Sequence, residues 1–142
     1  MIKSSFSFLA LAALTLLTAA CGHLDIQPEG DPERVLTGTV NFHADAPPPA
    51  DTVVTVRLVN PAGPAGLPEV LGEKTMENPG GPPIPFTIEY RAVDDLLRRG
   101  LMLEARVSIG GKLRYYNVNG HGVTLASSTE PQEVWVNATG KE

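Results

Sequence analysis

The sequence lacks several features that would mark a particular chemistry. Its single cysteine, Cys21, has no second thiol in the chain to pair with, so no internal disulfide can stabilise the fold. Basic side chains number 11 against 16 acidic ones, which argues against a surface for nucleic acid. The histidines His23, His43 and His121 share no metal-ligand spacing, and no local motif marks a nucleophile beside a base. We therefore predict that the protein is not an enzyme and has no metal site and no cofactor.

Long hydrophobic runs are also missing, apart from one near the start of the chain. This apolar stretch covers residues 6–17 and is shorter than the roughly 20 residues that a membrane-spanning helix needs. Lys3 precedes it, and the small residues Ala19 and Ala20 follow it, as in a secretory signal. The pattern predicts a helical signal peptide over residues 1–20 that is cleaved between Ala20 and Cys21.

The end of this segment, Leu17-Thr18-Ala19-Ala20-Cys21, resembles the lipobox of bacterial lipoprotein precursors. The resemblance implies that Cys21 carries covalent diacylglycerol and an N-linked acyl chain such as palmitate, which anchor the protein to a membrane. Gly22 follows Cys21 in place of the aspartate that tends to retain enteric lipoproteins in the inner membrane. The expected location is therefore the periplasmic face of the outer membrane. The alternatives are an ordinary cleaved signal followed by a free cysteine, or a retained membrane anchor.

An acidic stretch over residues 21–33 joins this predicted lipid site to the rest of the chain. It contains Asp25, Glu29, Asp31 and Glu33 among prolines and glycines, a composition that cannot bury a hydrophobic core. We predict a flexible tether over residues 21–33 and a single folded domain over residues 34–139.

Within this domain, apolar and polar residues alternate with the period of two that is typical of strands with one buried face. The predicted strands cover residues 36–42, 54–58, 84–90, 101–109, 112–118 and 133–137, with a weaker edge strand at 70–76. Gly110-Gly111 suits a two-residue hairpin turn, since both glycines tolerate positive φ. Pro85 lacks an N–H, which places its strand at an edge or a bulge. One short helix is expected over residues 93–100, with acids first and bases last.

About seven short strands with alternating faces favour an all-β fold. The expected architecture is an immunoglobulin-like antiparallel β-sandwich, in which two sheets cover each other's apolar faces. A small closed barrel is the alternative.

Several segments of the predicted domain carry a resemblance to a known family. They are Gly38-Thr39-Val40, Gly81-Pro82-Pro83-Ile84-Pro85-Phe86-Thr87-Ile88-Glu89-Tyr90, Ala105-Arg106-Val107 and Gly111-Lys112-Leu113. In this order they resemble the YbaY/YscW family of bacterial lipoproteins over residues 36–137. The resemblance implies a β-sandwich binding module without catalytic residues. One branch of the family is uncharacterised, and the type III secretion branch acts as a pilotin, a lipoprotein chaperone that helps a secretin ring assemble in the outer membrane.

Aromatic residues make up only 6% of the chain, and three of them are candidates for a binding surface. Trp135 alternates with two valines and should point to the outer face of its strand, while Tyr115 and Tyr116 should point to opposite faces of theirs. Such side chains can bind a peptide or stack on a sugar ring, although aromatics in strands also pack at rims.

We predict a monomeric, non-catalytic protein-interaction or chaperone-like module, anchored to the membrane by lipid, with an envelope protein such as a secretin as partner. The alternative function is a glycan-binding module for peptidoglycan or surface polysaccharide, which rests on Trp135 and the two tyrosines.

Overall fold

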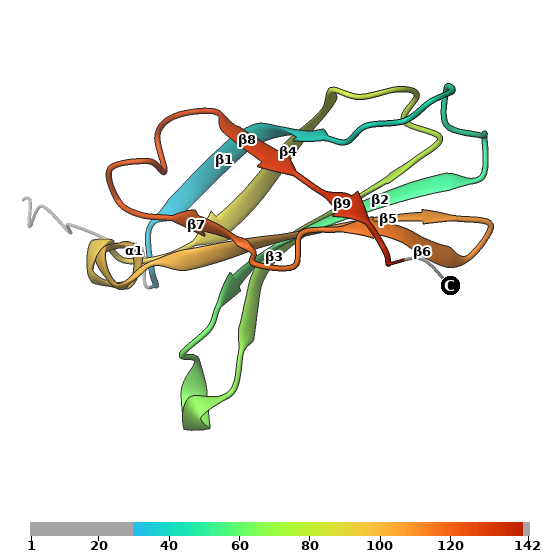
Figure 1. Ribbon diagram of the computed structural model, residues 1–142. Coiled ribbons are helices and arrows are strands. Elements are labelled where there is room, and N and C mark those ends of the chain that lie inside the picture. The colour runs from blue at the N-terminus through green and yellow to red at the C-terminus, as the bar shows by residue number, and fades with distance from the viewer. Residues whose placement is uncertain (1–29, 141–142) are drawn as a thin grey trace, which may run out of the picture.

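The computed structural model describes residues 30–140 of the chain. This part contains nine β-strands, one α-helix and one 3-10 turn (Figure 1). In chain order they are β1 (Glu33–Asn41), β2 (Thr52–Asn60), the 3-10 turn η1 (Pro64–Gly66), β3 (Glu69–Glu77), β4 (Ile84–Arg91), α1 (Asp94–Arg99), β5 (Leu101–Ile109), β6 (Lys112–Tyr116), β7 (His121–Val123), β8 (Gln132–Trp135) and β9 (Asn137–Ala138). The predicted signal peptide, its cleavage site at Ala20 and Cys21, and most of the predicted tether lie outside the described residues. Between residues 30 and 140, no helix has the length and apolar character needed to cross a membrane.

The strands form two sheets that pack face to face, so the predicted all-β sandwich is confirmed (Figure 1). The smaller sheet has the order β4-β1-β8. The larger sheet has the order β3-β2-β5-β6-β9, and β7 pairs with β5 beyond the end of β6. The hairpin of β2 and β3 is long, and its tip projects away from the sandwich (Figure 1).

The prediction of purely antiparallel pairing is wrong for one pair of strands. β1 and β8 run parallel, from Gly38 opposite Gln132 to Asn41 opposite Trp135. Parallel neighbours need a long crossover connection rather than a tight turn. Here almost the whole domain separates β1 from β8 along the chain, and the segment between β7 and β8 carries the chain from the larger sheet to the smaller one.

The single predicted C-terminal strand over residues 133–137 is also wrong, because the chain changes sheet within it. β8 belongs to the smaller sheet, whereas β9 pairs with β6 in the larger one. Val136 lies between them, and its N–H donates to the carbonyl oxygen of Asn41 at 2.9 Å. This switch and the three-residue strand β7 bring the number of strands from seven to nine.

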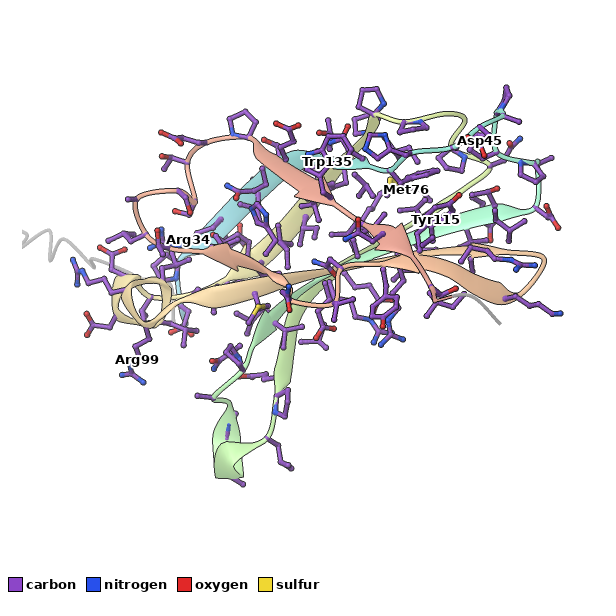
Figure 2. All side chains as sticks on the ribbon, in the orientation of Figure 1. Arg34, Asp45, Met76, Arg99, Tyr115 and Trp135 are labelled. Carbon is purple, nitrogen blue, oxygen red and sulfur yellow. The ribbon has the colours of Figure 1, made fainter. Side chains whose placement is uncertain are left out.

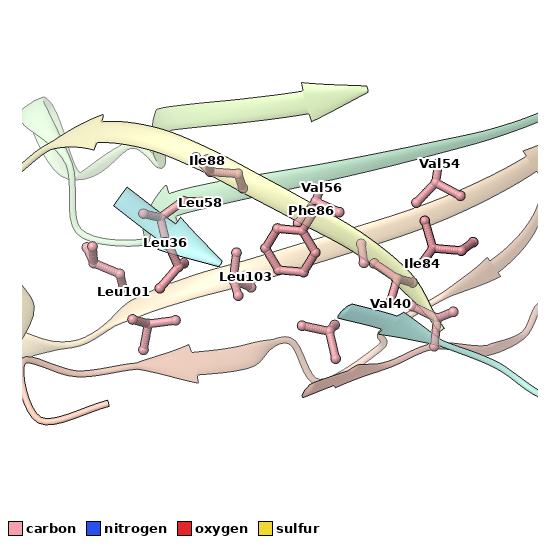
Figure 3. Packing of buried hydrophobic residues seen from close by; sticks show 14 of the residues in the cluster. Leu36, Val40, Val54, Val56, Leu58, Ile84, Phe86, Ile88, Leu101 and Leu103 are labelled. Carbon is pink, nitrogen blue, oxygen red and sulfur yellow. The ribbon is translucent and has the colours of Figure 1, made fainter. Parts of the chain in front are cut away.

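The core lies between the inner faces of the two sheets (Figure 3). β4 shows the alternation most clearly, because every second residue from Ile84 to Tyr90 is buried and those between are exposed. The strands of the larger sheet that contribute most are β2, with Val54, Val56 and Leu58, and β5, with Leu101, Leu103, Ala105 and Val107. The predicted inward and outward faces of these strands are confirmed.

Three local predictions are confirmed as well. Gly110 and Gly111 have φ of 58° and 79° and join β5 to β6 by a two-residue turn. β4 is an edge strand, in keeping with the preference of proline for sheet edges, and Pro85 is exposed there. α1 begins with two aspartates, ends with two arginines and is followed by Gly100 at φ 96°.

Candidate binding surfaces

Trp135 lies on the outer face of the smaller sheet, where its side chain is 47% exposed (Figure 2). Its ring is tilted by 35° against the ring of His43, with the two centroids 5.1 Å apart. Its indole N–H donates to the carboxylate of Glu133 at 3.0 Å. These two neighbours fix the orientation of an indole that nevertheless remains accessible from solvent.

The two tyrosines lie elsewhere. Tyr115 packs against the core at the inner side of β6, with its ring 4.7 Å from that of Phe42 (Figure 2). Tyr116 is opposite Arg106 of β5 on the outer face of the larger sheet. Trp135, Tyr115 and Tyr116 therefore occupy three separate environments, and the structure does not bring them together into one aromatic platform.

A small hollow of about 280 Å³ lies beside Tyr116 on the outer face of the larger sheet. Met102, Glu104 and Arg106 of β5 form its floor, and the turn of residues 117–120 forms its wall. This turn approaches the strand very closely, because a Cβ atom on Gly120 would lie 2.2 Å from the sulfur of Met102. The hollow is lined by charged, amide and apolar side chains together, which indicates no particular ligand.

A larger groove of about 850 Å³ lies where the described chain begins, and we call it the tether-side groove. Apart from Asp31, which precedes β1, its lining residues come from four parts of the fold: the start of β1, the start of β3, the end of β4, and α1. They are Asp31, Glu33, Arg34, Val35, Glu69, Val70, Leu71, Glu89, Tyr90, Arg91 and Leu96. No sequence pattern indicates this groove, because its walls are widely separated along the chain and no motif connects them.

The arginines of the tether-side groove are both engaged by carboxylates. Arg91 forms an ion pair with Glu33. Arg34, which lies beside α1 in Figure 2, donates from Nε to the carbonyl oxygen of Ala92 at 2.7 Å and forms an ion pair with Asp94. By contrast, Asp31, Glu69 and Glu89 make no ion pair with any residue between 30 and 140. The rim of the groove is therefore negatively charged.

Apolar side chains are exposed between these charges. Val35 on β1 and Val70 on β3 are 56% and 51% exposed, and Leu71 and Leu96 are partly buried against the core. Covering apolar surface is favourable by about 25 cal/mol for each Å² that is removed from water. An accessible apolar floor with a charged rim is typical of a site for another macromolecule.

Tyr90 is buried at the base of the tether-side groove, and burial raises its pKa above the ordinary value of 10.0, while the positive charge of Arg34 acts in the opposite direction. The folded protein then holds the phenolic proton more tightly than the unfolded chain does. The contribution of Tyr90 to stability should consequently be constant below about pH 10 and should be lost as the pH rises from there through the folded pKa.

This prediction is checked by urea unfolding at pH 8 and at pH 10.5 of the wild type and of Tyr90→Phe. The variant should lose less stability between the two pH values than the wild type. An equal loss in both proteins would show that Tyr90 does not titrate with folding.

Comparisons with known proteins agree with this fold. The model of one protein family, type III secretion system lipoprotein chaperone (YscW), matches residues 31–135 of the 142. A solved structure of an alternative pilotin from the type II secretion system of Vibrio cholerae superposes with a TM-score of 0.63 and 21% sequence identity, covering 78% of this chain and 100% of that chain. No protein of curated function matches the sequence. The structural likeness shows a shared fold, and the family match confirms the resemblance found in the sequence.

Proposed function

Because the chain belongs to the family of type III secretion system lipoprotein chaperones, we propose that it is a pilotin-like lipoprotein. In this role it binds a secretin subunit without catalysis and holds it at the periplasmic face of the outer membrane while the ring assembles. The observation that carries the proposal is the extent of the family match, which includes every strand from β1 to β8. The fold shared with a type II secretion pilotin supports it.

The lipid anchor is the second part of the proposal and rests on Cys21. A single acyl chain gives only marginal membrane binding, whereas two or more make attachment stable. About 12 residues separate Cys21 from the start of β1 at Glu33. A flexible chain of that length spans on the order of 20 Å, and about 40 Å when fully extended. The domain would thus remain close to the membrane surface.

Replacing Cys21 with alanine should abolish acyl labelling and release the protein from the membrane fraction, because no other thiol can carry the lipid. Fractionation of cells grown with radiolabelled palmitate measures both effects. His23→Ala, two residues away, is the matched control and should retain label and membrane association. Unaltered membrane association of Cys21→Ala would contradict the proposed anchor.

The proposed partner is tested by crosslinking intact cells that produce the acylated full-length chain and identifying what purifies with it. A secretin subunit should be recovered, and the amount of assembled secretin in the outer membrane should fall when the gene is deleted. Absence of any secretin subunit above the level in a mock purification would refute the pilotin-like role.

The glycan-binding alternative now rests on Trp135 alone, since the tyrosines are placed elsewhere. Its test is the tryptophan fluorescence of the protein, which has one indole, during titration with soluble peptidoglycan fragments. A saturable change that is lost in Trp135→Ala would support this alternative, and an unchanged spectrum would argue against it.

A further inference from the structure

The tether-side groove has the size and the surface of a docking site for a segment of another protein. Its volume of about 850 Å³ accommodates several side chains at once. The start of β3 forms one wall and supplies Val70 and Leu71, and β1 and α1 supply Val35 and Leu96 on the other side. An occupant with apolar side chains would cover surface that is now in contact with water.

The charges of the groove restrict the chemistry of that occupant. Four carboxylates line it against two guanidinium groups, and both of these groups are already paired with carboxylates. Asp31, Glu69 and Glu89 remain to interact with an incoming charge. An acidic rim attracts cations and repels anions at close range, so lysine or arginine beside apolar residues fits the groove and an acidic segment does not.

Two other occupants are disfavoured by the same charges. A second copy related by a two-fold axis through this groove would bring an identical acidic groove against the first one. The segment of this chain that precedes the groove, residues 22–29, contains Asp25 and Glu29 and neither lysine nor arginine. Like charges brought together in a partly desolvated site cost free energy, which leaves a cationic partner as the best match.

We propose that the tether-side groove binds a segment of a partner protein in which apolar residues are combined with lysine or arginine. The inference rests on the proposed function in one respect, namely that the segment belongs to the secretin subunit. The apolar side chains contact Val35, Val70, Leu71 and Leu96, and the cations lie near Asp31, Glu69 and Glu89. Because the groove adjoins the start of β1, the bound segment lies beside the chain that leads to Cys21.

The binding chemistry is tested with the acylated mature protein in detergent and three fluorescent synthetic peptides of equal length. The first contains leucine and lysine, the second leucine and glutamate, and the third serine and lysine. The Leu/Lys peptide should bind at least tenfold more tightly than either of the others, and its affinity should weaken with added salt. Equal binding of the Leu/Glu peptide would overturn the proposal.

The location is tested with paired charge-reversal variants on the surface. Glu69→Lys combined with Glu89→Lys should weaken Leu/Lys peptide binding at least tenfold. Glu77→Lys combined with Glu130→Lys makes the same change in net charge at exposed positions that do not line the groove, and should change binding less than twofold. Thermal unfolding confirms that all variants are folded. Equal weakening in both pairs would show non-specific electrostatics and overturn the assignment.

Crosslinking in cells separates this inference from the proposed function. If the wild type recovers a secretin subunit and the Glu69→Lys/Glu89→Lys variant recovers as much, the groove assignment is refuted while the pilotin-like role stands. If the wild type recovers none, the pilotin-like role is refuted, and the peptide measurements alone decide whether the groove binds cationic apolar segments.

Discussion

Replacing Phe86 with alanine should lower the free energy of unfolding by about 3–5 kcal/mol, the range for deleting a buried phenylalanine. The side chain is 4% exposed and lies in the core between the two sheets (Figure 3). Its cross-strand neighbour on β1 is Gly38, where an added Cβ would lie 2.8 Å from the ring. Gly38 has no side chain that could move into the vacated space, so the loss should fall in the upper part of this range.

Urea unfolding of the purified protein measures this effect. Thr87→Ala, the exposed neighbour on the same strand, is the control and should change stability by less than about 0.5 kcal/mol. A loss of less than 1 kcal/mol for Phe86→Ala would mean that the ring is not part of a close-packed core, against the alternation on which the fold assignment depends.

Asn117→Ala should cost about 2–4 kcal/mol, which is large for a polar side chain that is partly exposed. The side-chain oxygen of Asn117 accepts from the N–H of Ala105 at 2.9 Å, and its amide nitrogen donates to the carbonyl oxygen of Leu103 at 2.7 Å. Both partners belong to β5, at the place where pairing with β6 has ended and pairing with β7 begins. The side chain thus replaces a missing strand, and alanine would leave two backbone groups of buried residues without a partner.

Asn119→Ala provides a matched comparison, because it is the same substitution in the same turn at an exposed position. It should change the unfolding free energy by only a few tenths of a kcal/mol. Similar losses of unfolding free energy for Asn117→Ala and Asn119→Ala would show that the hydrogen bonds of the Asn117 side chain to β5 do not stabilise the fold. Amide hydrogen exchange offers a second readout, since the N–H of Ala105 should exchange faster in Asn117→Ala.

The inward and outward faces of the strands could be predicted from the sequence, because alternation with a period of two depends only on local geometry. Pro85 at an edge and the glycine turn before β6 were predictable for the same reason. Pairing between distant strands leaves no such local trace. The change of sheet at Val136 is an example: Val134 and Val136 are both buried, so the alternation passes through the switch without interruption.

The candidate sites also differ in whether they depend on local sequence or on the packing of distant segments. The exposure of Trp135 follows from its place between two buried valines, and the lipid site at Cys21 depends on a contiguous motif. The tether-side groove is assembled from β1, β3, β4 and α1, and its apolar residues are exposed at positions that alternation alone does not distinguish from ordinary surface. The packing of Tyr115 against Phe42 likewise depends on how β6 crosses the other sheet.

The central position of β1 in the smaller sheet determines how the domain responds to mechanical tension. Everything before residue 30 is joined to the fold through this strand, which pairs with β4 on one side and with β8 on the other. A pull on that end along the strand loads both ladders in shear, so their hydrogen bonds resist together. An edge strand in the same place would have only one such ladder to resist the pull. If Cys21 anchors the chain as proposed, a load on the domain reaches the fold at a point where the sheet resists extension.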